Sequence, residues 1–233
     1  MVNGKDEDAS APRRAGATQP ATRRLVRVLG LVVAGMAAEH GVGEVLQGDR
    51  VLAGPVIQSW PDSRFLRVEN GEPAFTLLPH AMAAGILTLV VAAVFAARVW
   101  FVDRGAHPRR DLVILVLVMF LVGGGFAPPL LGLALSIPAG WVRRRPADRA
   151  GGGWLRLGAS SGWLLAGAMA GWLALVPILP LVDVVDGVSE FWILPLFVMA
   201  AALSILATVA ARARDAGTAP TPRTEEIPEG DRS

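Results

Sequence analysis

Residues 111–142 decide the fold, and they read DLVILVLVMFLVGGGFAPPLLGLALSIPAGWV. As one straight helix this stretch would be about 48 Å long, whereas the hydrocarbon core of a bilayer is about 30 Å thick. The GGGFAPP segment at 123–129 interrupts regular helix, because glycine loosens the backbone and proline lacks an amide donor. We therefore expect a hairpin of two short membrane-inserted helices, 111–126 and 127–142. A re-entrant pair that turns inside the protein and one bent crossing are the alternatives.

The composition of the whole chain is that of a membrane protein. Of its 233 residues 53% are hydrophobic, the mean hydropathy is +0.48, and several apolar runs are about twenty residues long. We predict an all-α, polytopic transmembrane helical bundle, and its main partner is the lipid bilayer. Six inserted helices are expected, at about 25–46, 75–99, 111–126, 127–142, 161–182 and 190–211. The polar tails, 1–24 and 212–233, are expected to be disordered, and 47–74 forms an external loop.

The distribution of arginine predicts the topology. With six inserted helices and a cytoplasmic N-terminus, only Arg50, Arg64 and Arg67 of the 22 basic residues lie outside. Five spans would place the arginine-rich loop at 143–156 outside, against the positive-inside rule. We therefore expect a bacterial inner-membrane protein with both termini in the cytoplasm, and keep five spans as the alternative.

Several function classes find no support in the sequence. The chain has no cysteine, which excludes disulfides, thiolate metal sites and thiol catalysis. No nucleotide-binding loop, nucleophile elbow or zinc-protease motif is present. The arginines flank apolar runs and are not interleaved with aromatic residues, so nucleic-acid binding is not expected. Gly167 and Gly171 form a small-residue pattern typical of packed membrane helices, within one chain or between copies in a homo-oligomer.

Ionisable residues inside the first apolar run mark the place where function is expected. A charged group in hydrocarbon costs at least about 2.5 kcal/mol on insertion scales, so it faces a cavity, a partner or a ligand. Glu39 and His40 lie well inside the run, and Glu44 shares a helix face with His40 because it follows four residues later. If the second helix begins near Phe75, His80 lies about 8 Å inside it and at a similar depth.

Further acids are expected around this group. Glu72 precedes the second helix, and Asp183, Asp186 and Glu190 lie between the last two helices and form a secondary acidic rim. The expected outer face is therefore acidic and attracts cations. We take Glu39, His40, Glu44, Glu72 and His80 as the predicted ion- or proton-binding residues.

Three functions from different classes fit these residues. The first is the handling of a cation or proton, since an intramembrane glutamate and histidine suit a relay in a transporter. The second is a membrane oxidoreductase or hydrolase, with a divalent metal at His40, His80 and Glu44 or a haem between the two histidines. The third is a structural or accessory subunit in which Glu39 and Glu44 lie in the headgroup region and the cluster is only hydrated.

Two loops bear on this choice. The apolar part of the external loop, 51–60, is either a lid over the acidic cluster or an ordinary interfacial loop. The glycine-rich break at 123–129 is expected on the same side of the membrane as the cluster. It is either a simple turn or a source of bare carbonyls and helix ends for a substrate site.

Overall fold

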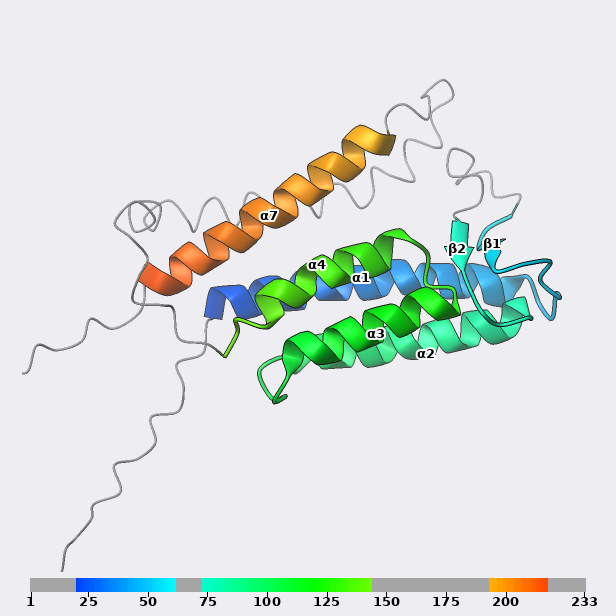
Figure 1. The fold of residues 1–233 in the computed structure, drawn as a ribbon, viewed down its shortest axis with the longest axis horizontal. Helices are drawn as coiled ribbons and strands as arrows, with labels where there is room; N and C mark the ends of the chain where they lie inside the picture. The colour runs from blue at the N-terminus through cyan, green and yellow to red at the C-terminus, as the bar shows by residue number, and fades with distance from the viewer. Residues whose placement is uncertain (1–19, 62–72, 144–192, 218–233) are drawn as a thin grey trace, which may run out of the picture.

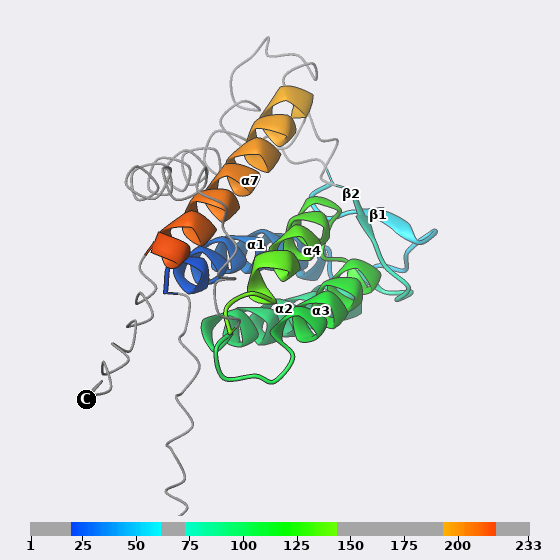
Figure 2. The same ribbon diagram turned by 60° about the vertical axis from the view of Figure 1, so that its left-hand side comes forward.

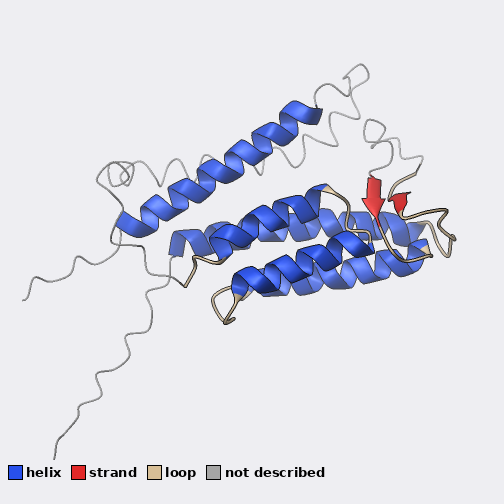
Figure 3. Cartoon of the chain, in the orientation of Figure 1, coloured by secondary structure: helices blue, strands red, loops and turns tan. Residues whose placement is uncertain are grey.

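The computed structural model describes residues 20–61, 73–143 and 193–217, which form five helices and one small sheet (Figure 1). The elements are α1 (Pro20–Leu46), β1 (Val56–Gln58), β2 (Pro73–Phe75), α2 (Ala81–Trp100), α3 (Pro108–Val122), α4 (Ala127–Ala139) and α7 (Ile193–Gly217). Helix dominates, as expected for an all-α protein (Figure 3). The helix expected at 161–182 lies outside the described residues.

Helix α1 is the centre of the described bundle. It packs against α2, α4 and α7, while α3 packs against α2 and α4 (Figures 1 and 2). The chain alternates in direction from α1 to α4, so α2–α3 and α3–α4 are connected at opposite ends of the bundle. The sheet lies beside the C-terminal end of α1, near the turn between α3 and α4.

Small residues allow α1 and α2 to approach closely. A side chain added to Gly41 would meet the Gly85 carbonyl oxygen at 2.9 Å, and a side chain at Gly85 would meet the Gly41 oxygen at 2.5 Å. Further along the same contact, Gly30 lies against the side chain of Val99. These close contacts are the packing mode of helices in a membrane, where small residues replace large ones between helices.

Two of the described helices, α1 and α2, are long and apolar enough to cross a membrane. Helices α3 and α4 have 15 and 13 residues, which corresponds to about 23 and 20 Å and is short of the hydrocarbon thickness. The described residues therefore do not support six spans. The predicted break between α3 and α4 is present, since Gly123 ends α3 in a left-handed conformation and Pro128 lies in the first turn of α4.

The first and last helices both extend further into the polar ends of the chain than the sequence predicted. Helix α1 starts at Pro20 instead of 25, and α7 continues to Gly217 instead of ending at 211. The reason is a contact between these two polar ends. The buried Asp215 carboxylate accepts hydrogen bonds from the backbone amides of Ala21 (2.8 Å) and Thr22 (2.9 Å) and from the Thr22 hydroxyl (2.6 Å). It satisfies amides at a helix N-terminus, which have no partner within their own helix.

The external loop contains a short antiparallel sheet that the sequence did not predict. β1 pairs with β2 in the register Ile57 to Ala74, and the chain from β2 to the start of α2 is not helical; within it Thr76 and His80 form isolated bridges with Val122 and Val51. Helix α2 therefore begins at Ala81, six residues later than expected, and its first amides donate to the Arg50 and Gly48 carbonyls. The loop is fixed to α3 as well, because the Leu77 amide donates to the Leu121 carbonyl at 2.9 Å.

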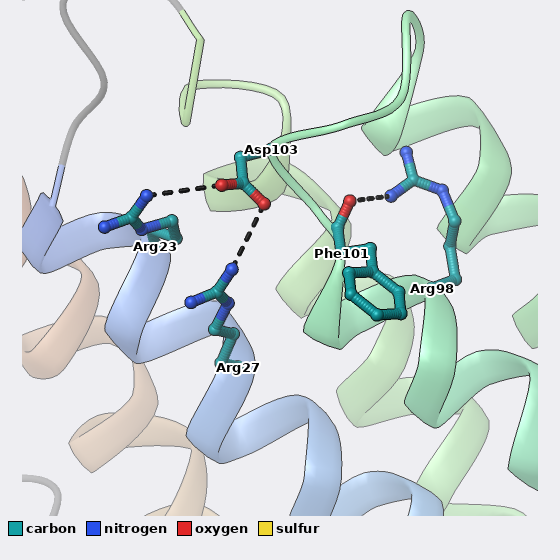
Figure 4. Close-up of polar contacts among 5 residues, drawn as sticks. All are labelled: Arg23, Arg27, Arg98, Phe101 and Asp103. Atoms are coloured by element: carbon teal, nitrogen blue, oxygen red, sulfur yellow. Dashed lines mark hydrogen bonds and ion pairs between the residues drawn. The ribbon is translucent and has the colours of Figure 1, made fainter.

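Arginine gathers at the end of the bundle opposite the sheet. Arg23 and Arg27 of α1 both bind Asp103 in the α2–α3 connection, at 3.2 and 3.1 Å (Figure 4). Arg98 donates to the Phe101 carbonyl beside them. Among the described arginines only Arg50 lies at the sheet end; the others are residues 23, 24, 27, 98, 104, 109, 110, 143, 212 and 214.

Candidate functional site

A buried polar cluster of His40, Ser59 and Glu44 lies where α1 meets the external loop. His40 and Glu44 are four residues apart on the buried face of α1 and are 6% and 0% exposed. Ser59, at 0% exposed, stands between them. Its Oγ is 2.9 Å from His40 Nδ1 and donates to Glu44 Oε1 at 3.2 Å. Since a serine hydroxyl has one proton, this arrangement makes Nδ1 of His40 the donor to Ser59.

The external loop carries Ser59 to α1 through three features. β1 ends at Gln58, directly before Ser59. Gln47, near the end of α1, donates from Nε2 to the Gln58 carbonyl at 2.9 Å and to the Ser59 carbonyl at 3.0 Å. The absence of a side chain at Gly43 leaves room for the Ser59 backbone and the Trp60 ring to lie against the helix. Thus Ser59 and Trp60 cover the C-terminal part of α1.

The α3–α4 turn covers the cluster from another side. Gly123 lies against the Glu44 carboxylate, so that an added Cβ would be 2.5 Å from both carboxylate oxygens. Gly125 lies against the imidazole ring of His40, and a Cβ added at this position would collide with Nε2. Both glycines have positive φ, +118° and +74°. The turn thus lies at the same end of the bundle as the cluster, as the sequence predicted. It covers the cluster, which is closed in this structure.

The charge of this cluster is poorly compensated within the described residues. Glu44 Oε2 is buried and has no hydrogen-bond partner there. No described Arg or Lys forms an ion pair with Glu44. Because a buried carboxylate without a partner for one oxygen costs free energy, this oxygen is a place where a proton or another cation would bind favourably.

The structure separates the predicted site residues into two groups. His40 and Glu44 come together as expected, whereas Glu39 is half-buried on a neighbouring face of α1. His80 does not lie inside a helix; it is the N-cap residue of α2, is 42% exposed, and places Nδ1 2.9 Å from Asp49 Oδ1. The predicted position of His80 inside the second helix was wrong, because α2 begins only at Ala81 and His80 itself has an extended backbone.

The geometry also argues against the metal and haem sites predicted at these histidines. Within the described ranges no three His, Asp or Glu side chains are grouped so as to hold a metal ion. His80 pairs with Asp49, apart from the His40 and Glu44 pair. Axial ligation through Nε2 of His40 would require the Gly125 backbone to move away. The expected ligand set of His40, His80 and Glu44 is therefore not assembled.

Other predicted residues lie outside the described residues. These are Glu72 at the expected entrance, the acidic rim of Asp183, Asp186 and Glu190, and the packing glycines Gly167 and Gly171.

Ser59 is the member of the buried cluster that the sequence analysis missed. A serine carries no charge, and its role depends on a loop that returns to α1 after 15 residues. The available signal was the apolar stretch at 51–60, which the sequence analysis considered as a lid. If this stretch covers the cluster, its few polar residues are the ones expected to contact the cluster.

Comparison of the chain with protein-family models, with curated proteins and with solved structures gives no match. The chemistry of the cluster therefore rests on its own geometry.

Proposed function

We propose that this chain is an inner-membrane helical protein that binds and moves a proton or another cation at the buried cluster of His40, Ser59 and Glu44. The observation that carries the proposal is the Glu44 carboxylate, which is fully buried on an apolar helix and has one oxygen without a partner among the described residues. Such a group in a membrane segment is expensive, and a functional role is the ordinary reason for keeping it.

Insertion in a membrane is supported by the apolar outer faces of three helices. Large apolar side chains point away from the described bundle on α2, α3 and α4. They are Ile86, Leu87, Val90 and Val94 of α2, Ile114, Leu117, Val118 and Leu121 of α3, and Leu130, Leu133 and Ile137 of α4. Many exposed large apolar side chains on neighbouring helices suit contact with lipid.

The proposed orientation follows from the arginine end. By the positive-inside rule this end faces the cytoplasm, so that both the start of α1 and the end of α7 lie there. If Arg27 marks the inner interface, His40 lies about 20 Å and Glu44 about 26 Å along α1, within a hydrocarbon core of about 30 Å. The cluster then lies beneath the outer surface and is reached from the periplasm once the external loop opens.

The α3–α4 pair is proposed as a hairpin that enters the membrane from the cytoplasm and turns inside the protein. Its short helices support this proposal, and so does the contact of its turn with buried side chains of α1. Together with α1, α2, α7 and the apolar segment at 161–182, this hairpin would give six inserted helices. The segment at 161–182 is included on its sequence alone.

The test is ion flux into liposomes that contain the purified full-length protein and a trapped pH indicator or cation indicator. Glu44→Gln removes the charge but keeps the shape, so it is expected to reduce flux to the level of empty liposomes. Asp49→Asn is the matched control, because Asp49 is a 77% exposed acid near the same end of the bundle. Wild-type protein that moves neither protons nor metal cations would refute the proposal and favour an accessory role.

A further inference from the structure

We propose that the ion handled at this cluster is the proton, and that the Ser59 hydroxyl passes it between His40 and Glu44. This inference rests on the proposed function and names its substrate and route. It starts from two consecutive hydrogen bonds: His40 Nδ1 is 2.9 Å from Ser59 Oγ, and Ser59 Oγ is 3.2 Å from Glu44 Oε1. A hydroxyl can accept one hydrogen bond and donate another at the same time, which is the property a relay needs.

The surroundings of the cluster favour a proton over a metal ion. Metal cations need several oxygen or nitrogen ligands, and six or more for calcium. The described residues offer only one carboxylate, one hydroxyl and one imidazole here, and the hydroxyl already occupies the space between the other two. Gly123 fills the space beside the carboxylate, at a distance that leaves no room even for a methyl group. A proton requires no such room.

The transfer is balanced in atoms and charge. With His40 protonated on both nitrogens and Glu44 ionised, the Nδ1 proton moves to Ser59 Oγ while the Ser59 hydroxyl proton moves to Glu44 Oε1. The N–H bond of His40 and the O–H bond of Ser59 break, and new O–H bonds form on Ser59 and Glu44. The result is a neutral imidazole, an intact hydroxyl and a carboxylic acid.

Uncharged groups surround the relay in the described residues. The loop after β1 contributes Ser59 and Trp60, α2 approaches with Gly85, and the α3–α4 turn contributes Gly123 and Gly125. The titratable residues nearest in the chain or at the same end are Glu39 on α1, Asp49 and Arg50 in the loop, and His80 at the start of α2. The proposed relay uses none of these four.

One turn covers both ends of the relay. Nε2 of His40, where a proton would arrive or leave, lies against Gly125, and the carboxylate of Glu44 lies against Gly123. Movement of the turn, together with opening of the external loop, is therefore what would expose the relay to water.

The experiment compares proton flux into liposomes for three full-length proteins. Ser59→Ala removes the bridging hydroxyl and is expected to reduce proton flux at least about tenfold, since positioned proton transfer typically contributes more than this. Ser136→Ala is the matched control, because Ser136 is also buried and donates to the Leu133 carbonyl at 2.7 Å, far from the cluster in the chain. It is expected to retain wild-type flux. Wild-type flux is also expected to slow in D₂O, as proton transfer does.

The outcomes distinguish the two proposals. Proton flux that survives Ser59→Ala, or wild-type flux of a metal cation without proton flux, overturns the relay and leaves the proposed function standing. Wild-type protein that moves no ion overturns both. If Ser59→Ala does not fold, the D₂O comparison decides: proton flux equally fast in both solvents overturns the relay.

Discussion

Replacement of Gly125 by alanine tests whether the α3–α4 turn is packed onto His40 as the structure shows. Gly125 has φ of +74°, and an added Cβ would collide with His40 Nε2. A non-glycine residue in the left-handed region costs about 1–2 kcal/mol, and overpacking of a tight contact about 1–3 kcal/mol. We therefore expect Gly125→Ala to lower the free energy of unfolding by about 2–5 kcal/mol.

Two other glycines separate the backbone effect from the collision. Gly48 has φ of +68° but nothing within 4 Å of an added Cβ, so Gly48→Ala is expected to cost only the backbone part, about 1–2 kcal/mol. Gly35 lies within α1, has ordinary φ and also has nothing within 4 Å, so Gly35→Ala is expected to stabilise the protein by about 0.5–1 kcal/mol.

The assay is reversible unfolding of the detergent-solubilised protein, followed by circular dichroism. The expected order of stability is Gly35→Ala above wild type, then Gly48→Ala, then Gly125→Ala. If Gly125→Ala were no less stable than Gly48→Ala, the turn would not press on His40, and the closed cluster described above would be incorrect.

Two further predictions concern the arginine end of the bundle. Asp215→Ala should destabilise the protein by about 1–3 kcal/mol, because two backbone amides and the Thr22 hydroxyl lose their acceptor. The expected result is faster amide hydrogen exchange at the start of α1, and an unchanged exchange rate would contradict this prediction. Burial raises the pKa of Asp103, but a hydrogen bond with its own backbone and the charges of Arg27 and Arg23 outweigh this, so its pKa lies below the ordinary value of 3.8. The resulting stabilisation of the folded protein is present above pH 3.8 and disappears as the pH falls through the lowered pKa. On acidification, the melting temperature of Asp103→Asn should therefore fall less than that of wild type. If the two proteins lost melting temperature equally, the ion pairs of Asp103 with Arg23 and Arg27 would not stabilise the fold.

The sequence predicted the helical elements better than their ends. Apolar runs located α1 to α4 and α7, and α1 ends at Leu46 as expected. The start of α2 was misplaced because Phe75 to Leu78 is apolar enough to pass for helix. Pro79 was the local signal, since the residue before a proline avoids helical conformation. The strands were missed because three residues are too few to show a period of two.

The candidate site was predictable where it depended on local spacing and not where it depended on distant contacts. The four-residue separation of His40 and Glu44 placed both on one face, and both are buried. Ser59 and the glycines of the turn reach the same place through tertiary structure, which one sequence does not reveal. Likewise, the contact of Thr22 with Asp215 joins residues 193 positions apart, so neither polar end showed by itself that it was ordered.

The contact between Asp215 and α1 also has a consequence for biosynthesis. Helix α1 is made first, but the carboxylate that satisfies its leading amides is among the last parts of the described chain to be synthesised. At a translation rate of about 5–20 residues per second, the ribosome needs about 10–40 s to reach Asp215 after Thr22. For that interval the beginning of α1 has no final partner, so its N-terminal turn becomes fixed only when the last helix arrives.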